Sequence, residues 1–249
     1  MYQTGLVSVS FRKLTPKQVI DAVAAAGLKY IEWGSDVHAP CNDIARLEEI
    51  ARMQKESGIS CSSYGTYYHI GKEKTEEIYD YIKAAKILGT NILRLWCGNG
   101  KPCAEFTQEE REAIYAQSRE LAKIAEKENV ILCMECHGWT LTEEPESALE
   151  VMQAVDSPAF RMYWQPNQYK TVEDNIASAK MLAPYVYNIH VFNWEGDVWY
   201  PLRGGLETWR QYLSCIPGDH ILLLEFMPDG RVESLPEEAR TLFEMIGEK

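Results

Sequence analysis

Four polar side chains come near the ends of four successive segments that resemble β-strands. Two carboxylates, an imidazole and an amide oxygen form a donor set typical of Mn, Mg or Co sites, and compatible with Zn. If the carboxylates lie about 6 Å apart, they repel by about 3 kcal/mol at an effective dielectric of ~20, and a shared cation would relieve this. The pattern predicts one divalent metal ion held by Glu135 in segment 130–136, Gln165 in segment 160–165, His190 in segment 187–193 and Glu225 in segment 220–226.

Structural interpretations of these and nearby residues stay open. Arg94 could pair with Glu135 or contact a substrate, and His190 could be a core histidine with satisfied hydrogen bonds. Glu32 could contact a substrate or form an ion pair. The metal hypothesis therefore depends on the set and not on any one residue.

The spacing of glycines indicates how the chain positions these groups. Gly27, Gly58 and Gly89 are 31 residues apart, and each precedes a β-branched or aromatic run. This period fits a repeated strand, loop and helix, with glycine in the left-handed conformation at the helix end. A chain of 249 residues holds eight such units. We expect a single α/β domain over residues 1–249, a (β/α)8 TIM barrel, with a doubly wound open sheet as the competing fold.

Helix-start signals agree with this period. Capping boxes are expected to begin at Thr15, Thr107 and Ser234, each after a predicted strand and loop. An amphipathic helical stretch follows every predicted strand. The eight strands are expected near residues 5–11, 30–34, 59–64, 91–97, 130–136, 160–165, 187–193 and 220–226.

Aromatic residues gather at the same predicted end of the barrel, where the active sites of such barrels lie. Six of the 7 tryptophans come at or just beyond strand ends, and Trp209 alone falls on a helix. Aromatic side chains in the wall of a site suit the apolar faces of a sugar ring. Any single tryptophan could instead pack in the core without contacting a ligand. The candidate substrate-binding residues are His137, Trp33, Trp96, Arg94, Tyr67, Trp164, Trp194 and Arg203.

Composition and charge limit the partners. The net charge of −12 is the wrong sign for holding a nucleic acid backbone, so we expect no nucleic acid partner. No apolar run is long enough to cross a membrane, and no signal peptide is recognised. The 7 scattered cysteines fit a reducing, cytoplasmic compartment, and Cys133 and Cys136 are interpreted as core residues, since strand positions three apart face opposite sides. A homo-oligomer is compatible with the sequence.

The motifs that carry these residues resemble those of a known family. The chain resembles the xylose isomerase-like TIM barrels, the sugar phosphate isomerase/epimerase group, over nearly its whole length. The resemblance implies one divalent metal held by Glu, Asp, His and Glu from strands five to eight. Glu135, His190 and Glu225 match these positions. The strongest motifs are residues 135–138, 163–167, 188–194 and 224–226.

The sequence departs from the family in two respects. Gln165 stands where Asp is usual, and the loss of one negative charge should weaken metal affinity. Ketose 3-epimerases of this family also carry Glu, His and Arg at the positions of Leu141, Gln168 and Gly196. Arg203 could replace that missing Arg, or it could be a loop charge.

These observations favour a metal-dependent isomerase or epimerase acting on a keto sugar or sugar derivative. Glu135 and Glu225 would transfer protons α to a carbonyl through an enediolate, and His137 could hydrogen-bond substrate oxygens. The same enolate chemistry would serve a lyase or dehydratase on a keto-polyol or 3-keto-glycoside. A catalytically reduced, carbohydrate-binding accessory subunit is a further alternative. A nuclease of the endonuclease IV type is disfavoured because the chain has only 5 histidines and a negative charge.

Overall fold

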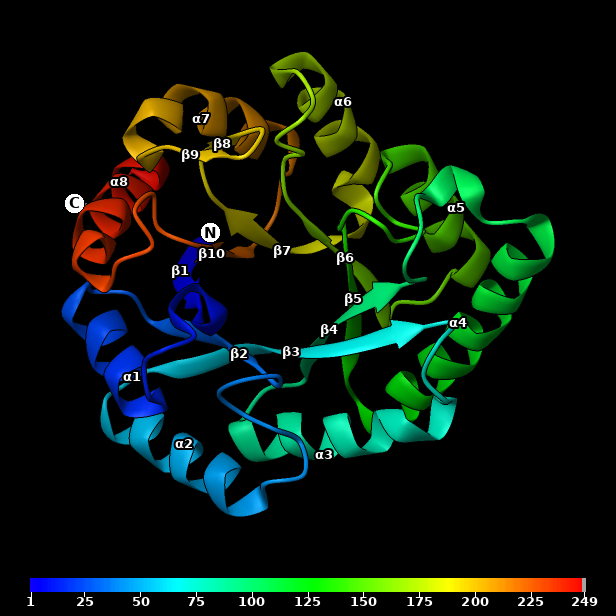
Figure 1. Ribbon diagram of the computed structural model, residues 1–249, viewed down its shortest axis with the longest axis horizontal. Helices are drawn as coiled ribbons and strands as arrows, with labels where there is room; N and C mark the ends of the chain where they lie inside the picture. Colours follow the sequence, from blue (N-terminus) through cyan, green and yellow to red (C-terminus); the bar gives the residue numbers. More distant parts are fainter. Residues whose placement is uncertain (248–249) are drawn as a thin grey trace.

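Eight parallel strands close into a barrel surrounded by helices, as expected from the glycine spacing (Figure 1). The computed structural model describes residues 1–247. The barrel strands are β1 (Tyr2–Val7), β2 (Tyr30–Gly34), β3 (Ser60–Ile70), β4 (Ile92–Cys97), β5 (Ile131–Glu135), β6 (Phe160–Trp164), β7 (Val186–Val191) and β10 (His220–Leu224). They pair in sequence order, and β10 closes the ring against β1 with Leu6 opposite Leu224. The predicted (β/α)8 TIM barrel is confirmed.

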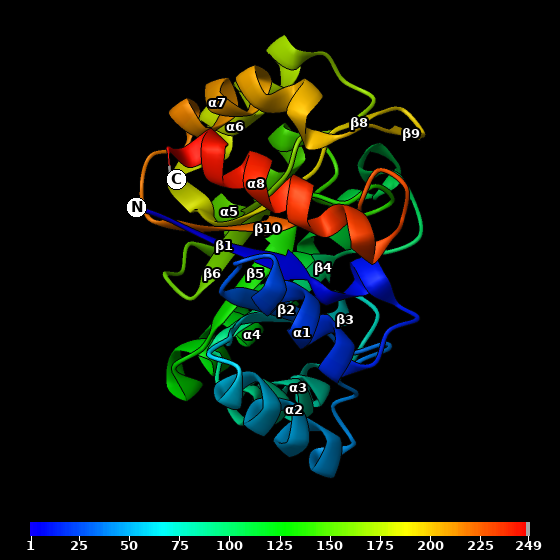
Figure 2. The same cartoon turned by 90° about the vertical axis from the view of Figure 1, so that its left-hand side faces the viewer.

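A helix follows each barrel strand and covers its outer side (Figures 1 and 2). The α-helices are α1 (Pro16–Ala25), α2 (Ile44–Glu56), α3 (Ile78–Leu88), α4 (Gln108–Glu128), α5 (Pro145–Val155), α6 (Val172–Leu182), α7 (Leu206–Cys215) and α8 (Leu235–Ile246). Short 3-10 helices are η1 (Ser8–Phe11), η2 (Thr75–Glu77), η3 (Cys103–Glu105), η4 (Ala183–Tyr185), η5 (Leu202–Gly205) and η6 (Val232–Ser234). None of the helices in residues 1–247 combines the length and apolar character needed to cross a membrane.

The helix-start signals hold at two of the three predicted positions. Thr15 and Thr107 form capping boxes, with their side chains accepting from the backbone N–H three residues on. The prediction for Ser234 is wrong, because this residue ends the helical turn η6 and its hydroxyl donates to Asp229 instead. A capping box that the sequence analysis missed begins α6 at Thr171.

One element was not expected from the sequence. A two-stranded antiparallel hairpin, β8 (Trp194–Glu195) and β9 (Val198–Trp199), follows β7. It lies beyond the carboxyl ends of the barrel strands, on the side opposite the N-terminus (Figure 2). The hairpin therefore sits at the end of the barrel where the polar residues converge.

Alternation along the strands separates two cores. Side chains that point outward pack against the helices in a large apolar cluster, whereas a smaller cluster fills the barrel interior. Cys133 belongs to the inner cluster and Cys136 packs against the outer one, as the interpretation of these residues as core cysteines requires. Glu32 and Gln165, the sequence neighbours of Trp33 and Trp164, face the interior and carry polar groups.

Candidate active site

Two acidic side chains and one histidine meet at the carboxyl end of the barrel. Glu135 ends β5, His190 lies in β7, and Glu225 directly follows β10. One potential ligand atom from each residue lies within 4.8 Å of the other two, and all three side chains are buried. Nδ1 of His190 is 3.5 Å from Oε1 of Glu135 and 3.5 Å from Oε2 of Glu225. The predicted convergence of these residues is therefore present.

Gln165 completes the group from the end of β6. Its Oε1 lies 2.9 Å from Nδ1 of His190, while its amide nitrogen donates to the carbonyl of Cys136 at 3.1 Å. The hydrogen bond to Cys136 orients the amide so that its oxygen points toward the other ligand atoms. Gln165 thus adds an amide oxygen beside His190, next to the three clustered residues.

These residues fit a divalent cation. Burial raises the pKa of Glu225, and repulsion by the negative charge of Glu135 raises it further. A positive ion among the carboxylate oxygens would relieve this repulsion. Nε2 of His190 is buried, has no hydrogen-bond partner, and lies 3.7 Å from Oε2 of Glu32. If Nδ1 binds a metal, the ring proton must sit on Nε2 and face Glu32, the carboxylate–histidine arrangement typical of metal sites.

A buried ion-pair network lies beside this cluster. Arg94 in β4 donates from Nε to Oε1 of Glu32 at 2.7 Å and from Nη1 to Oε2 of Glu135. Burial alone would raise the pKa of Glu32, but Arg94 and, to a smaller extent, His190 outweigh this effect and lower the pKa to about 2. Gly65 in β3 makes room for the network, since a Cβ there would lie 2.7 Å from Nη2 of Arg94. Arg94 therefore pairs with Glu135, and Glu32 also forms an ion pair, so that Arg94 joins the two carboxylates.

An aromatic wall borders the cluster on the β3–β5 side. Trp96 donates from Nε1 to Oε2 of Glu135, so this oxygen is held by two donors and Oε1 faces the metal cluster. The Trp96 ring lies 4.7 Å from His137 and 5.1 Å from Tyr67, measured between ring centroids. His137 is exposed, and its Nδ1 is 2.8 Å from the carbonyl of Gly138. This bond places the proton on Nδ1 and leaves Nε2 as a free acceptor.

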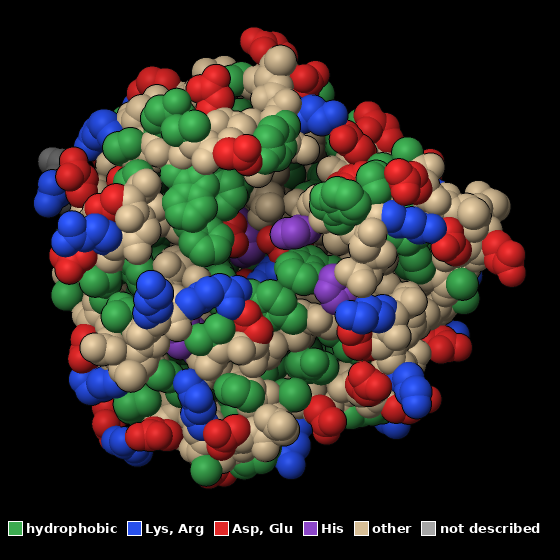
Figure 3. Space-filling model, in the orientation of Figure 1, with side chains coloured by type: hydrophobic (Ala, Val, Ile, Leu, Met, Phe, Trp, Pro, Cys, Tyr) green, Lys and Arg blue, Asp and Glu red, His purple; other side chains and the backbone are tan. Residues whose placement is uncertain are grey.

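A second aromatic wall comes from the hairpin and the strand end opposite. Trp194 stacks on Phe192 at 3.9 Å and on Trp199 at 5.4 Å, and Trp199 stacks on Phe226 at 5.3 Å. Figure 3 shows a hollow at this face, with histidine and acidic side chains in its floor and hydrophobic groups around it. Glu135, Gln165 and Glu225 line the cavity, whose volume is about 570 Å³.

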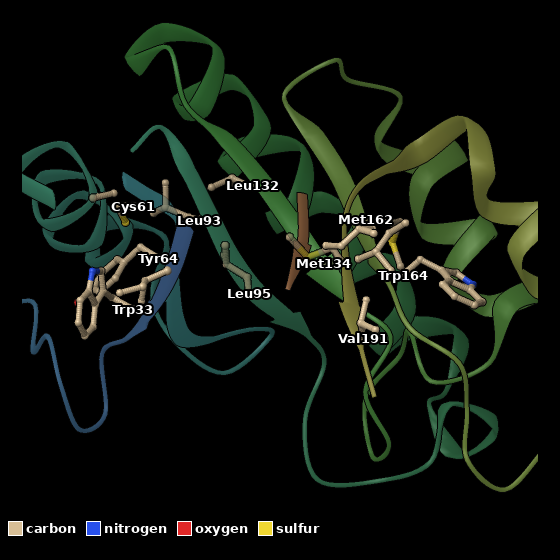
Figure 4. Packing of buried hydrophobic residues seen from close by; sticks show 14 of the residues in the cluster. Trp33, Cys61, Tyr64, Leu93, Leu95, Leu132, Met134, Met162, Trp164 and Val191 are labelled. Atoms are coloured by element: carbon tan, nitrogen blue, oxygen red, sulfur yellow. The ribbon is translucent and has the colours of Figure 1, made fainter. Parts of the chain in front are cut away.

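Of the candidate substrate-binding residues, His137 and Trp194 line this cavity. Trp96, Arg94 and Tyr67 lie beside the Glu135 network without lining the cavity, and three other candidates lie farther away. Trp33 and Trp164 are fully buried outside the barrel interior, where Trp33 donates to Gln54 and Trp164 packs against Trp209 (Figure 4). Because they are strand neighbours of the inward residues Glu32 and Gln165, alternation turns them toward the helices.

Arg203 is the third residue that lies away from the cavity. It is in η5 and forms an exposed ion pair with Glu244 of α8 at 2.5 Å. It therefore does not supply the arginine that the family's epimerases carry. Its interpretation as a loop charge is the one that agrees with the structure.

Phe226 lines the cavity, and Trp199 stacks on it. Neither was among the candidate substrate-binding residues. Phe226 directly follows Glu225 and has a left-handed φ of 53°. Its backbone N–H donates to the Ser10 hydroxyl at 2.9 Å, which helps to hold this strained conformation. An aromatic residue next to a predicted ligand was the available signal for Phe226. The contact of Trp199 depends on a hairpin that local propensity did not indicate.

Comparisons with known proteins agree with this architecture. The chain is 28% identical over 201 residues to a 3-dehydroshikimate dehydratase of Bacillus anthracis, covering 76% of this chain and 71% of that protein. It superposes on the crystal structure of the probable 3-DHS dehydratase AsbF of Bacillus anthracis with a TM-score of 0.81, at 20% identity over 97% of this chain and 98% of that one. The zinc-bound structure of the IOLI protein gives a TM-score of 0.78, at 16% identity over 98% of both chains.

The family model described as "Xylose isomerase-like TIM barrel" matches residues 20–247. That span holds seven of the eight barrel strands and all three clustered residues, Glu135, His190 and Glu225. The protein therefore belongs to the xylose isomerase-like TIM barrel family.

Proposed function

We propose that the protein is a metal-dependent lyase that acts on a keto-polyol or 3-keto-glycoside. The observation that carries the proposal is the convergence of Glu135 and Glu225, which line one cavity with Gln165, on the buried imidazole of His190. These four side chains would hold the ion. A divalent ion bound there would polarise the carbonyl oxygen of the substrate and stabilise an enolate by several kcal/mol.

The free nitrogen of His137 is the candidate general base. Its Nε2 is available because Nδ1 donates to Gly138, and the ring stands beside Trp96 at the edge of the cavity. His137 would accept the proton on the carbon next to the carbonyl, and the C–H electron pair would form the enolate. The enolate would then collapse to a C=C bond as the C–O bond at the β carbon breaks.

The departing oxygen needs a proton, and His137, protonated by the first step, is the candidate donor. Glu225, like Glu135, would bind the ion as a carboxylate and so has no proton to give. Glu135 is also held at Oε2 by Arg94 and Trp96, which suits a fixed ligand better than a group that exchanges protons. This assignment modifies the expectation that both carboxylates transfer protons.

Two considerations favour elimination over epimerisation. An epimerase must remove a proton on one face and return one on the other, and the epimerase residues of the family are absent at Leu141, Gln168 and Gly196. In addition, the curated relative and the structure with TM-score 0.81 are both named dehydratases. The isomerase or epimerase remains the second candidate, because the two carboxylates Glu135 and Glu225 converge and both line one cavity.

The reaction can be tested by NMR in D2O with the Mn²⁺-loaded protein. A panel of a 3-keto-glycoside, an inosose, 3-dehydroshikimate and a ketohexose separates the alternatives. The proposal expects loss of the α C–H signal together with an enone product from at least one compound. Deuterium exchange with an epimeric product and no elimination would favour the epimerase. No exchange with any compound would favour the accessory, carbohydrate-binding alternative.

A further inference from the structure

The basic groups at the cavity are already paired with carboxylates of the chain itself. Among the residues in the described part of the chain that line the cavity, Lys170 is the only lysine or arginine, and it lies 3.1 Å from Glu144. Arg94, beneath the floor, is shared by Glu32 and Glu135. An anionic substrate would therefore have to compete with existing, partly desolvated ion pairs for its charge partner.

Several backbone amides at or near the cavity also donate to side chains of the chain itself. In many barrels a phosphate binds at the loops after the last two strands, on free backbone N–H groups. Here the amide of Leu202, in the loop region after β7, donates to Oε2 of buried Glu238 at 2.9 Å. The amide of Phe226 donates to Ser10, as described above. These two amides are thus not free to bind an anion.

A similar arrangement holds at the β5 and β6 loops. The amide of Trp139 donates to Glu143 at 2.7 Å, and that of Thr171 donates to Asp174 at 3.2 Å. Glu143 and Asp174 therefore hold these two amides, which are not free for a substrate anion. Each of these carboxylates also lines the cavity.

The lining as a whole is negative. Six carboxylates contribute to it against the single lysine, so a bound divalent ion would still leave an excess of negative charge. The six are Glu135, Glu143, Glu144, Glu146, Asp174 and Glu225. The upper walls are aromatic, with Trp194 and Phe226 on one side and Trp139 on the other.

We infer that the cavity takes an electrically neutral cyclic polyol or glycoside and discriminates against carboxylated and phosphorylated substrates. This inference rests on the proposed function only in taking the cavity as the substrate site. Apolar ring faces would lie against the aromatic walls, hydroxyl groups would meet the carboxylates, and a charged substituent would meet like charge without a free cation. The neutral members of the proposed class, inososes and 3-keto-glycosides, are thus preferred over 3-dehydroshikimate.

The test uses two ligands that cannot enolise and that differ in charge and by one methyl group: shikimate and its methyl ester. Binding of each is measured by calorimetry, with and without Mn²⁺, at low and high salt. We expect the ester to bind at least about tenfold more tightly at low salt, and the difference to shrink at high salt. Equal or tighter binding of shikimate would overturn the inference, and so would a failure of both ligands to bind.

A matched pair of variants assigns the preference to the cavity. Glu146, an exposed lining residue in the first turn of α5, is replaced in Glu146→Gln, and Glu120, on the exposed side of α4, in Glu120→Gln. Glu146→Gln should reduce a tenfold preference to about threefold, whereas Glu120→Gln should leave it unchanged. Equal effects of the two variants would show that net charge, and not the cavity lining, sets the preference, and would overturn the inference.

The outcome is separable from that of the proposed function. Failure of the lyase would be seen as absence of C–H exchange in D2O with every neutral and anionic ketone. The charge preference is measured with unreactive ligands and does not depend on that result. Preference for shikimate together with elimination activity would contradict the charge inference and leave the proposed chemistry intact.

Discussion

Nε2 of His190 lies 3.7 Å from Oε2 of Glu32, and this nitrogen is buried without a hydrogen-bond partner. The opposite ring nitrogen faces Glu135, Glu225 and Gln165. Nδ1 of this imidazole therefore faces the proposed metal ligands, whereas Nε2 faces a carboxylate that can fix the tautomer of the ring.

Replacement of Glu32 should weaken metal binding although Glu32 is not a proposed ligand. Glu32→Gln removes the carboxylate that would accept from Nε2 of His190, and we expect Mn²⁺ affinity to fall by about 10- to 100-fold. The measurement is calorimetric titration of the metal-free variant, with circular dichroism to confirm folding. Unchanged affinity would show that Glu32 serves only its ion pair with Arg94.

Gln165→Asp should act in the opposite direction. The substitution keeps an oxygen near His190 and adds a negative charge to the cluster, so Mn²⁺ should bind more tightly, by about tenfold. Competition with a fluorescent chelator measures the change. A decrease would indicate that the shorter side chain cannot reach the ion, and Gln165→Glu provides the matched test of reach.

Arg94 is predicted to be important for stability as well as for the site. Arg94→Met leaves Glu32 and Glu135 buried without their shared cation, which should destabilise the fold by about 3–5 kcal/mol. The exposed pair of Arg203 and Glu244 supplies the control, because Arg203→Gln should cost only about 0–1 kcal/mol. Urea unfolding of both variants gives the comparison. Similar losses would show that burial of the Arg94 network contributes little.

His38 should make stability depend on pH. Burial lowers the pKa of His38, whose ring contacts the Ser8 hydroxyl and the Leu14 carbonyl at 3.1 Å each. Because the native pKa is below the ordinary value of 6.5, the neutral ring contributes stability above that pH. This stability is lost as the pH falls from 6.5 toward the native pKa.

The measurement is the free energy of unfolding from pH 8 to pH 5 for the protein and for His38→Gln. The variant should be less stable near pH 8, and the difference between the two proteins should narrow as the pH falls. A constant difference across this range would mean that His38 titrates alike in the folded and unfolded chain.

The sequence was sufficient to predict the barrel and the convergence of the candidate metal ligands for physical reasons. Glycine spacing reports the repeat length, and polar residues late in parallel strands must meet at one end, as Glu135, His190 and Glu225 do. The proposed roles of Trp33 and Trp164 neglected strand alternation, which turns both side chains toward the helices.

Other features depend on contacts that local sequence does not specify. The stack of Trp199 on Phe226 requires a hairpin of only two-residue strands, for which local propensity gives little signal. The partner of Arg203 lies in α8, far along the chain, and only tertiary packing brings them together. Similarly, the sequence left the ion-pair partners of Arg94 undecided. Only the register of the strands brings Glu32 and Glu135 to the same guanidinium.

The central claim is that Glu135, His190 and Glu225 together hold one divalent ion. Titration of the metal-free protein with Mn²⁺ tests it most directly, with Glu135→Gln and Glu225→Gln titrated in parallel. The account predicts one ion bound per chain and a loss of binding in both variants, with Glu120→Gln unaffected. Absence of binding in the unaltered protein, or full binding in the two variants, would contradict it.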